Sequence, residues 1–229
     1  LLHALCKIDG LHWIRIHYLY PEDTTDEIID AVASEEKIVK YLDIPIQHVN
    51  DTILKKMNRR GTKAELTALF RKLRERIPGV VIRTSLIAGL PYEDEAAFAE
   101  LCEFLKEMRL ERAGAFVFSP QEGTAAAKMP YPPTEIAQQR AEHIAALQAQ
   151  IMDAYNDGLI GETLEVLCEG YDAELQLYYG RSFADSPDID GRVLFTSERP
   201  AVTGEFYPVF IGDIQDGDPV GAAVWRENA

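Results

Sequence analysis

Hydrogen-bonding side chains gather where the predicted strands of this sequence end. The stretch YLDIPIQHVN, residues 41–50, runs from apolar residues into Gln47, His48 and Asn50. Three other predicted strands end in a similar way, with His17 and Tyr18, with Gly89 and Glu93, and with Ser119 and Gln121. Parallel α/β folds carry their chemistry at the carboxyl ends of the strands, so this recurrence predicts one shared binding site.

The predicted strand over residues 80–91 carries groups suited to a charged ligand. Arg83 and Ser85 are two positions apart and therefore share one face of the strand. An arginine that points into a barrel needs a partner, either a bound carboxylate or a neighbouring acid such as Asp43. Gly89 would allow the backbone to approach a ligand closely.

Several of these side chains also have a purely structural interpretation. Gln47 either faces a ligand or makes a hydrogen bond at the strand end, and His48 either orients a substrate or caps the following turn. Asn50 or Asp51 is expected to cap the short helix TILKKM. The side chains of Phe116 and Phe118 are expected in the core.

The run LKKMNRRGTK, residues 54–63, carries five cations and no acid. Such a run usually forms a solvated face of a helix. Because this one follows the carboxyl end of a predicted strand, contact with RNA or with an acidic substrate loop is the alternative. The sequence leaves both interpretations open.

The elements that would position these residues alternate between strand and helix. Strands are predicted over 13–20, 40–47, 80–91 and 112–120, and amphipathic helices over 24–36, 61–79 and 94–110. Thr62 and Glu65 predict a capping box for the second helix. Such βαβ units predict an α/β fold with parallel strands, either an incomplete barrel or an open doubly wound sheet. No G-x-G-x-x-G motif follows any strand, so we favour the barrel.

The pattern of apolar and polar residues changes after Gly158. Residues 134–158 predict a long connecting helix, and residues 159–229 contain short alternating runs broken by Gly, Pro and Asp. This pattern predicts a small, closed antiparallel β-barrel of about five strands, after an α/β domain over residues 1–133. Tyr178, Tyr179, Arg181 and Phe183 interleave aromatic groups with a cation, which suits a recognition surface, although half of them are expected in the core.

Charge and cysteine content exclude several classes of protein. The net charge is −15, and residues 159–229 hold 14 acids against 4 cations. This balance opposes direct binding to nucleic acid and favours a basic partner. No 18-residue apolar run or secretion signal is present, so a cytosolic protein without membrane contact is expected. Cys6, Cys102 and Cys168 are too far apart in sequence to predict a local metal site.

Four segments together resemble the radical S-adenosylmethionine (SAM) methylthiotransferases, and most closely the RimO type, which modifies an aspartate of a ribosomal protein. YLDIPIQHVNDTILKKMNRRG is similar to the fourth-strand segment of that family, IRTSLIAGLPYEDE to its fifth and FVFSPQEGTAA to its sixth. LYYGRSFADSPDIDG resembles its C-terminal TRAM domain, a five-stranded β-barrel. The resemblance covers essentially the whole chain and implies the second half of a radical SAM barrel followed by a TRAM domain.

The resemblance also implies cofactors, partners and roles for individual residues. The cofactors of the full-length enzyme would be SAM and two 4Fe-4S clusters, and a 5′-deoxyadenosyl radical would activate the β-carbon of the aspartate. The partner would be the basic small-subunit ribosomal protein twelve, held by the acidic TRAM domain. The implied cofactor-binding residues are Gln47, Arg83, Ser85, Gly89, Glu93 and Phe118. The implied substrate-binding residues are His48, Tyr178, Tyr179, Arg181 and Phe183.

The sequence departs from the family in one important respect. It contains no CxxxCxxC loop, whose thiolates hold the catalytic 4Fe-4S cluster in these enzymes. No catalytic residue and no metal ligand is therefore assigned, and the chain by itself is expected to be inactive. The alternatives are a tRNA methylthiotransferase and a non-catalytic module that binds a ribosomal protein.

Overall fold

The computed structural model describes residues 1–225 and divides into two compact units, which meet between Ile151 and Met152. This division falls inside the predicted connecting helix, which forms one continuous helix, α6 (Thr134–Asp157). Each unit has its own apolar core, as the change in sequence texture after this helix predicts.

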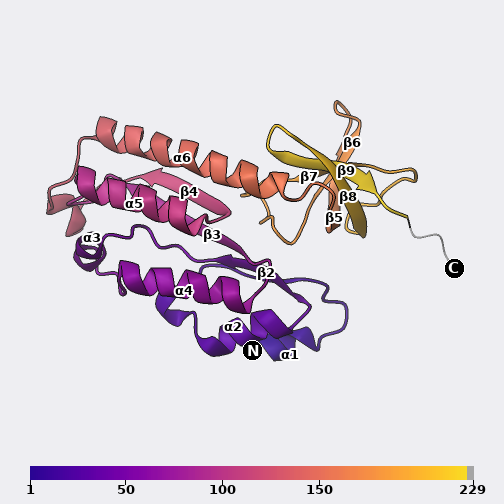
Figure 1. Ribbon diagram of the computed structural model, residues 1–229, viewed down its shortest axis with the longest axis horizontal. Coiled ribbons are helices and arrows are strands. Elements are labelled where there is room, and N and C mark those ends of the chain that lie inside the picture. Colours follow the sequence, from indigo (N-terminus) through magenta and orange to yellow (C-terminus); the bar gives the residue numbers. More distant parts are fainter. Residues whose placement is uncertain (226–229) are drawn as a thin grey trace. The chain divides into compact units, whose positions relative to one another are not determined.

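The first unit is built on four parallel strands (Figure 1). Their spatial order follows the sequence: β1 (Ile14–Ile16), β2 (Ile38–Asp43), β3 (Val81–Ala88) and β4 (Arg112–Val117). In the register of the ladders, Leu42 lies opposite Ile82, and Thr84 lies opposite Ala113. The predicted α/β fold with parallel strands is confirmed. The first strand is shorter than predicted, and beyond it Tyr18 has a positive φ of 57°, which an extended strand does not tolerate.

Helices follow the strands as the alternating pattern predicts. They are α1 (Leu2–Cys6), α2 (Asp26–Ser34), α3 (Asp51–Lys56), α4 (Lys63–Arg76) and α5 (Glu95–Met108), with short 3₁₀ turns η1 (Pro21–Asp23) and η2 (Ala126–Lys128). The Asn50 side chain accepts hydrogen bonds from the N–H groups of Thr52 and Ile53, which confirms it as the cap of α3. Thr62 accepts from the N–H of Glu65 at the start of α4, as predicted.

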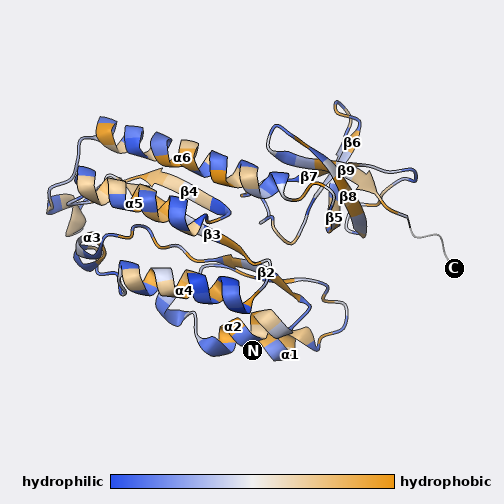
Figure 2. Ribbon diagram, viewed as in Figure 1, coloured by the Kyte–Doolittle hydropathy of each residue, from blue (hydrophilic) through white to orange (hydrophobic). Residues whose placement is uncertain are grey.

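The core of the first unit lies between the sheet and its helices. Strand residues such as Leu42 and Leu86 are fully buried there, and Phe70 of α4 meets Phe104 of α5 with ring centroids 6.0 Å apart. Figure 2 shows the corresponding alternation of polar and apolar residues along α4, α5 and α6. This packing leaves the other face of the strands, which carries Arg83 and Ser85, to form the site described below.

The second unit is a closed barrel of five strands. They are β5 (Thr163–Asp172), β6 (Leu177–Arg181), β7 (Val193–Thr196), β8 (Phe206–Gln215) and β9 (Asp218–Ala223), in the order β5-β6-β7-β9-β8. One prediction is wrong in detail, because β7 and β9 pair in parallel and the barrel is mixed rather than antiparallel. A closed barrel with an odd number of strands cannot be antiparallel at every pair, and here the parallel pair is β7 with β9, whereas β9 is antiparallel to β8. None of the helices within residues 1–225 combines the length and the apolar character needed to cross a bilayer.

Candidate functional site

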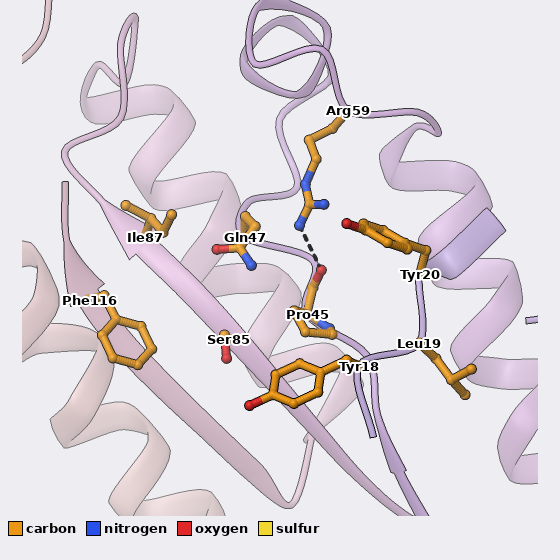
Figure 3. Close-up of a pocket in the computed structure, with 9 residues that line it drawn as sticks. All are labelled: Tyr18, Leu19, Tyr20, Pro45, Gln47, Arg59, Ser85, Ile87 and Phe116. Atoms are coloured by element: carbon orange, nitrogen blue, oxygen red, sulfur yellow. Dashed lines mark hydrogen bonds between the residues drawn. The ribbon is translucent and has the colours of Figure 1, made fainter. Parts of the chain in front are cut away.

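A pocket of about 430 Å³ opens beside the carboxyl ends of the strands in the first unit (Figure 3). Every strand, or the segment that follows it, contributes to the lining. Of the strand-end residues that the sequence analysis named, however, only Tyr18 and Gln47 line the pocket. The lining residues are Tyr18, Leu19, Tyr20, Pro45, Gln47, Arg59, Ser85, Ile87 and Phe116. Arg59 is the only residue with a formal charge among them, so the pocket combines one cation with aromatic, aliphatic and amide groups.

Gln47 reaches the pocket because the backbone changes course after β2. Pro45 has no N–H to donate to β3, and the hydroxyl of Thr84 accepts from the N–H of Ile46 at 3.2 Å and donates to the carbonyl of Ile44 at 2.8 Å. The N–H of Gln47 then returns to β3 and donates to the carbonyl of Ser85 at 2.9 Å. Irregular pairing of this kind re-aims a side chain at a sheet edge.

Gln47 itself adopts an uncommon backbone conformation, with a φ of 68°. Left-handed backbone in a residue other than glycine costs of order 1 kcal/mol and persists where the surrounding contacts hold it. The bonds to β3 hold Gln47 in place, since the N–H of Ile87 also donates to the carbonyl of Gln47 at 2.9 Å. The backbone of Gln47 is therefore held by β3, and its side chain projects into the pocket (Figure 3).

Arg59 is a pocket residue that the sequence did not single out. Its guanidinium donates to the carbonyl of Pro45 at 3.0 Å and lies 5.6 Å from the ring centroid of Tyr20. In the sequence it is one of five cations within residues 54–63, and nothing in that run distinguishes it from its neighbours. Only the fold shows that it faces the lining residues while Lys55, Lys56 and Arg60 remain exposed.

Arg83 and Ser85 share a face of β3 but have different surroundings. Ser85 lines the pocket, whereas the guanidinium of Arg83 donates to Asp43 of β2 at 2.9 Å. Both members of this ion pair are buried. The alternative in which Arg83 pairs with Asp43 is therefore the one that the structure shows.

Phe116 is a correction to the sequence analysis, which expected its side chain in the core. It is 55% exposed and lines the pocket, and it shares a face of β4 with Gly114, which lies beside Arg83 of β3. Phe118 does pack inside, against Ile53 and Leu90, with its ring 5.5 Å from that of Tyr131. It does not line the pocket.

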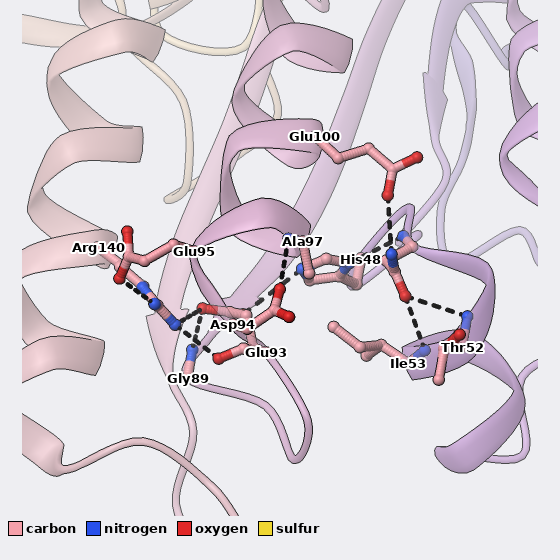
Figure 4. Close-up of polar contacts among 11 residues, drawn as sticks. His48, Thr52, Ile53, Gly89, Glu93, Asp94, Glu95, Ala97, Glu100 and Arg140 are labelled. Carbon is pink, nitrogen blue, oxygen red and sulfur yellow. Dashed lines mark hydrogen bonds and ion pairs between the residues drawn. The ribbon is translucent and has the colours of Figure 1, made fainter.

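Glu93 is the centre of a buried polar network at the end of β3 (Figure 4). One carboxylate oxygen accepts from the N–H of Gly89 at 3.0 Å and from the guanidinium of Arg140 at 2.9 Å. Arg140 belongs to α6, and it also binds the carbonyl of Glu93 and the carboxylate of Glu95. The network ties the end of β3 to α6.

His48 faces the other oxygen of Glu93. The Nε2 atom of His48 lies 3.5 Å from Oε2 of Glu93, and both side chains are fully buried. Neither atom makes a hydrogen bond to another group in the described part of the chain. The N–H of Asn50 donates to Nδ1 of His48 at 2.9 Å, so the proton of the ring lies on Nε2 and points at the carboxylate. His48 thus both caps the following turn and contacts the network.

These contacts decide the protonation of Glu93. Burial by itself raises the pKa of the carboxyl group, but the facing His48 ring, the Gly89 N–H and the Arg140 guanidinium together lower it by more. The pKa of Glu93 therefore lies below its usual value. The carboxylate remains charged at neutral pH and can hold both of its partners.

Gly89 serves close packing in this structure. Its φ is 81°, and a Cβ atom added to it would lie 2.3 Å from the Cβ of Ala137 in α6. The close approach that the sequence predicted at Gly89 therefore brings the strand end against a helix. Any side chain at this position would push α6 away from the end of β3.

The candidate recognition residues of the second unit divide into two groups. Tyr178 and Phe183 pack against the barrel core, and the ring of Tyr178 lies 5.6 Å from that of Phe195. Tyr179 and Arg181 lie on the other face of β6, where Arg181 forms an ion pair with Glu169 and the guanidinium of Arg192 lies 5.7 Å from the ring of Tyr179. The structure does not bring these four residues together as one surface.

Comparison with known proteins identifies both units. Residues 1–105 match the radical SAM superfamily, and residues 160–224 match the TRAM domain. Over 229 residues the chain is 43% identical to the ribosomal protein uS12 methylthiotransferase RimO of Anaeromyxobacter sp. (strain Fw109-5), with 99% of this chain and 48% of that protein covered. The RimO of Lachnoclostridium phytofermentans is 42% identical over 97% of this chain and 51% of its own length.

The chain thus spans about half the length of the curated relatives it matches. Among solved structures, coproporphyrinogen III oxidase (HemN) from Escherichia coli, a radical SAM enzyme, matches with a TM-score of 0.51 and 20% identity, covering 61% of this chain and 32% of that one. This similarity supports the radical SAM fold of the first unit.

A 4Fe-4S cluster does not fit the residues of this chain. Cys6, Cys102 and Cys168 are all free thiols, and no three His, Cys, Asp or Glu side chains within residues 1–225 are grouped to hold a metal ion. SAM fits better, because the pocket offers a guanidinium, an amide and a hydroxyl beside apolar and aromatic side chains. These groups match the carboxylate, the ribose and the adenine of that molecule.

Proposed function

We propose that this chain, which belongs to the RimO-type radical SAM methylthiotransferase family, binds SAM and takes part in adding a methylthio group to the aspartate β-carbon of ribosomal protein uS12. The similarity to RimO proteins over nearly its whole length supports this proposal. The single observation that carries it is the pocket at the strand ends, where Gln47, Ser85 and Arg59 converge.

The proposed roles follow from the surroundings of each residue. Arg59 binds the carboxylate of SAM, since it is the one charged group in the lining. Gln47 and Ser85 bind the polar atoms of the adenosyl part, and Ile87 and Phe116 cover its apolar faces. Four other residues support the strand ends without lining the pocket. Arg83 does so through Asp43, Gly89 and Glu93 through α6, and Phe118 through the adjacent core. His48 acts with this second group.

SAM bound here would supply the 5′-deoxyadenosyl radical that an unactivated C–H bond requires, once a reduced 4Fe-4S cluster held outside this chain gave it one electron. The part of this chain is to bind the cofactor, to keep water from it with the aromatic lining and to orient it toward the substrate. No step of the proposal uses a cluster ligand from this chain. For the chain by itself we therefore retain the alternative of a binding module without catalysis, which the lack of a cluster site within residues 1–225 favours.

We further propose that the second unit docks the ribosomal protein. Residues 159–229 hold 14 acids against 4 cations, so this unit presents negative potential to a basic partner. The same charge count disfavours the alternative of a tRNA substrate for the TRAM domain. Tyr179 and Arg181, on the outward face of β6, are the contacts we assign to the partner. We place the activity in the cytoplasm, where ribosomal proteins are made and assembled.

The proposal for the pocket is tested by calorimetric titration of the chain with SAM and with S-adenosylhomocysteine. Arg59→Gln should weaken binding about tenfold, because a charge-assisted hydrogen bond is worth roughly 1.5 to 3 kcal/mol. Arg71→Gln is the matched control, since Arg71 is exposed and pairs with Glu107. Equal binding by Arg59→Gln and the wild-type chain would refute the assigned role, and no binding by the wild-type chain would refute the cofactor site in this chain.

A further inference from the structure

Four cations in the segment that follows β2 have no acidic partner, and one of them, Arg59, lines the pocket. Within residues 1–225, the side chains of Lys55, Lys56, Arg59 and Arg60 form no ion pair with a carboxylate, and three of them are exposed. The neighbouring helices differ in this respect. Arg71, Lys72, Arg74, Arg76 and Lys106 each pair with an acid at 2.6 to 3.2 Å. In a protein with a net charge of −15, this concentration of unneutralised positive charge is unusual.

Exposed tyrosines accompany these cations. Arg59 lies over the ring of Tyr20 at 5.6 Å from its centroid, and Lys56 lies over the ring of Tyr92 at 5.1 Å. Tyr20 is 53% exposed and Tyr92 is 41% exposed. Tyr92 also has a φ of 67°, a conformation that is rare for an aromatic residue and that turns its side chain outward at some cost. We call the six residues Tyr20, Lys55, Lys56, Arg59, Arg60 and Tyr92 the cationic rim.

The cationic rim borders the pocket directly, because Tyr20 and Arg59 are also lining residues (Figure 3). Acids close to these residues in the sequence include Glu22, Asp23 and Asp51, and Glu93 next to Tyr92 pairs with Arg140. The Asp51 carboxylate accepts from the backbone N–H of Lys63, and none of the three pairs with a cation of the rim. Positive charge and partly exposed tyrosine rings therefore occur together in the cationic rim, and Tyr20 and Arg59 join it to the pocket.

We propose that the cationic rim binds single-stranded RNA beside the pocket. Cations that follow a phosphate backbone and aromatic rings that stack on bases are the two features such a surface needs. An acidic peptide would use the cations but would leave the tyrosine faces without a partner, so the combination favours RNA. The negative charge of the whole chain does not prevent this contact, because salt screens charges beyond about 8 to 10 Å. The total charge argued against direct nucleic-acid binding, whereas the sequence of this basic run left contact with RNA open as an alternative.

The test is fluorescence anisotropy of a labelled 12-nucleotide oligouridine, and of the matching oligoadenosine, titrated with the wild-type chain between 50 and 400 mM KCl. Four phosphate contacts predict that the logarithm of the association constant falls with the logarithm of salt with a slope of about −3. Neither SAM nor methylthio transfer enters this measurement. A failure here is therefore distinguishable from a failure of the proposed function.

Two triple variants with the same change in net charge separate the rim from the overall charge. Lys55→Gln/Lys56→Gln/Arg60→Gln should reduce the salt slope to about −0.7 and weaken binding at least tenfold at 100 mM KCl. The control, Arg71→Gln/Lys72→Gln/Lys106→Gln, removes three exposed cations that already have acidic partners and should stay within twofold of the wild type. Equal weakening by both triple variants would overturn the proposal.

Tyr20 separates RNA from an acidic polypeptide. Tyr20→Ala should weaken RNA binding about tenfold through lost stacking, and Tyr20→Phe should restore it. If Tyr20→Ala has no effect and polyglutamate displaces the RNA at equal charge concentration, the rim is a site for acidic peptides and the proposal is wrong. It is also wrong if the wild-type chain shows no salt-dependent binding to either oligonucleotide.

Discussion

The two units of this chain use charged side chains in different ways. In the first unit, Glu93, Arg140, Arg83 and Asp43 are buried and bind one another. In the second unit the ion pairs are at least partly exposed, as between Arg181 and Glu169, around a small apolar core. Buried pairs fix the shape of a site, because breaking one leaves a charge without a partner, whereas surface pairs contribute little to stability and leave charge available to a partner.

The largest effect expected is on the barrel core. Phe195 is fully buried, and Phe195→Ala should destabilise the second unit by about 4 kcal/mol. Hydrogen exchange measured by mass spectrometry should show faster exchange in β5 to β9 and unchanged exchange in β3 and β4. Phe210→Ala is the control, since Phe210 is 45% exposed and should cost less than about 1 kcal/mol. Equal acceleration in both units would contradict the division into two cores.

The next largest effect is expected at the buried network. Glu93→Gln keeps the shape of the side chain but removes the charge that faces Arg140 and His48, so we expect a loss of about 3 kcal/mol. Urea denaturation measures it. Glu103→Gln is the matched control, because Glu103 forms an exposed pair with Lys106 and should stay within about 0.5 kcal/mol. Similar losses in both variants would show that burial of the pair does not matter.

Gly89 tests the packing of the strand end against α6. Gly89→Ala should cost about 2 kcal/mol, since the new methyl group would overlap with Ala137 and the backbone has a positive φ. Gly123→Ala has nearly the same φ, 82°, with nothing within 4 Å of the added atom, and should cost about 1 kcal/mol. The difference between the two unfolding free energies isolates the contact with α6. Equal losses of stability in the two variants would mean that α6 can move away from Gly89 at no cost in free energy.

The pH dependence of stability tests the charge on Glu93. Its pKa in the folded chain lies below the usual 4.5, so its stabilising effect is fully present above pH 4.5 and is lost as the pH falls through the folded value. The difference in unfolding free energy between wild type and Glu93→Gln should therefore be constant from pH 7 to about pH 5 and should shrink below that range. A difference that grows with acid would contradict the direction of the shift.

The smallest effect is expected at the surface of the barrel. Arg181→Gln breaks the pair with Glu169 and should change the stability of the chain by less than about 0.5 kcal/mol. Thermal unfolding of the wild type and of Arg181→Gln should be measured in 0.1 M and in 1 M KCl. The difference in stability between the two proteins should not be larger at 1 M KCl, since salt screens such pairs. A loss comparable to that of Glu93→Gln would remove the contrast between the two units.

Local patterns in the sequence determined much of the fold. The alternation of apolar strands with amphipathic helices predicts the parallel sheet, and the caps at Asn50 and Thr62 depend on neighbouring residues alone, so both were predicted correctly. The change to short runs after Gly158 likewise predicts the closed barrel. The clustering of polar residues at strand ends pointed to the edge of the sheet where the pocket opens, because parallel strands bring their carboxyl ends to one edge, but it identified only Tyr18 and Gln47 among the lining residues.

Only the tertiary structure decided which candidate site residues line the pocket and which support the strand ends. Glu93 and Gln47 look equally available in the sequence, but Glu93 is held by Arg140, a residue 47 positions away, and Gln47 is turned into the pocket by its pairing with β3. Arg59 and Phe116 became lining residues for the same reason, and β9 became parallel to β7. In each case the deciding contact joins segments far apart in the chain, and local periodicity carries no information about such contacts.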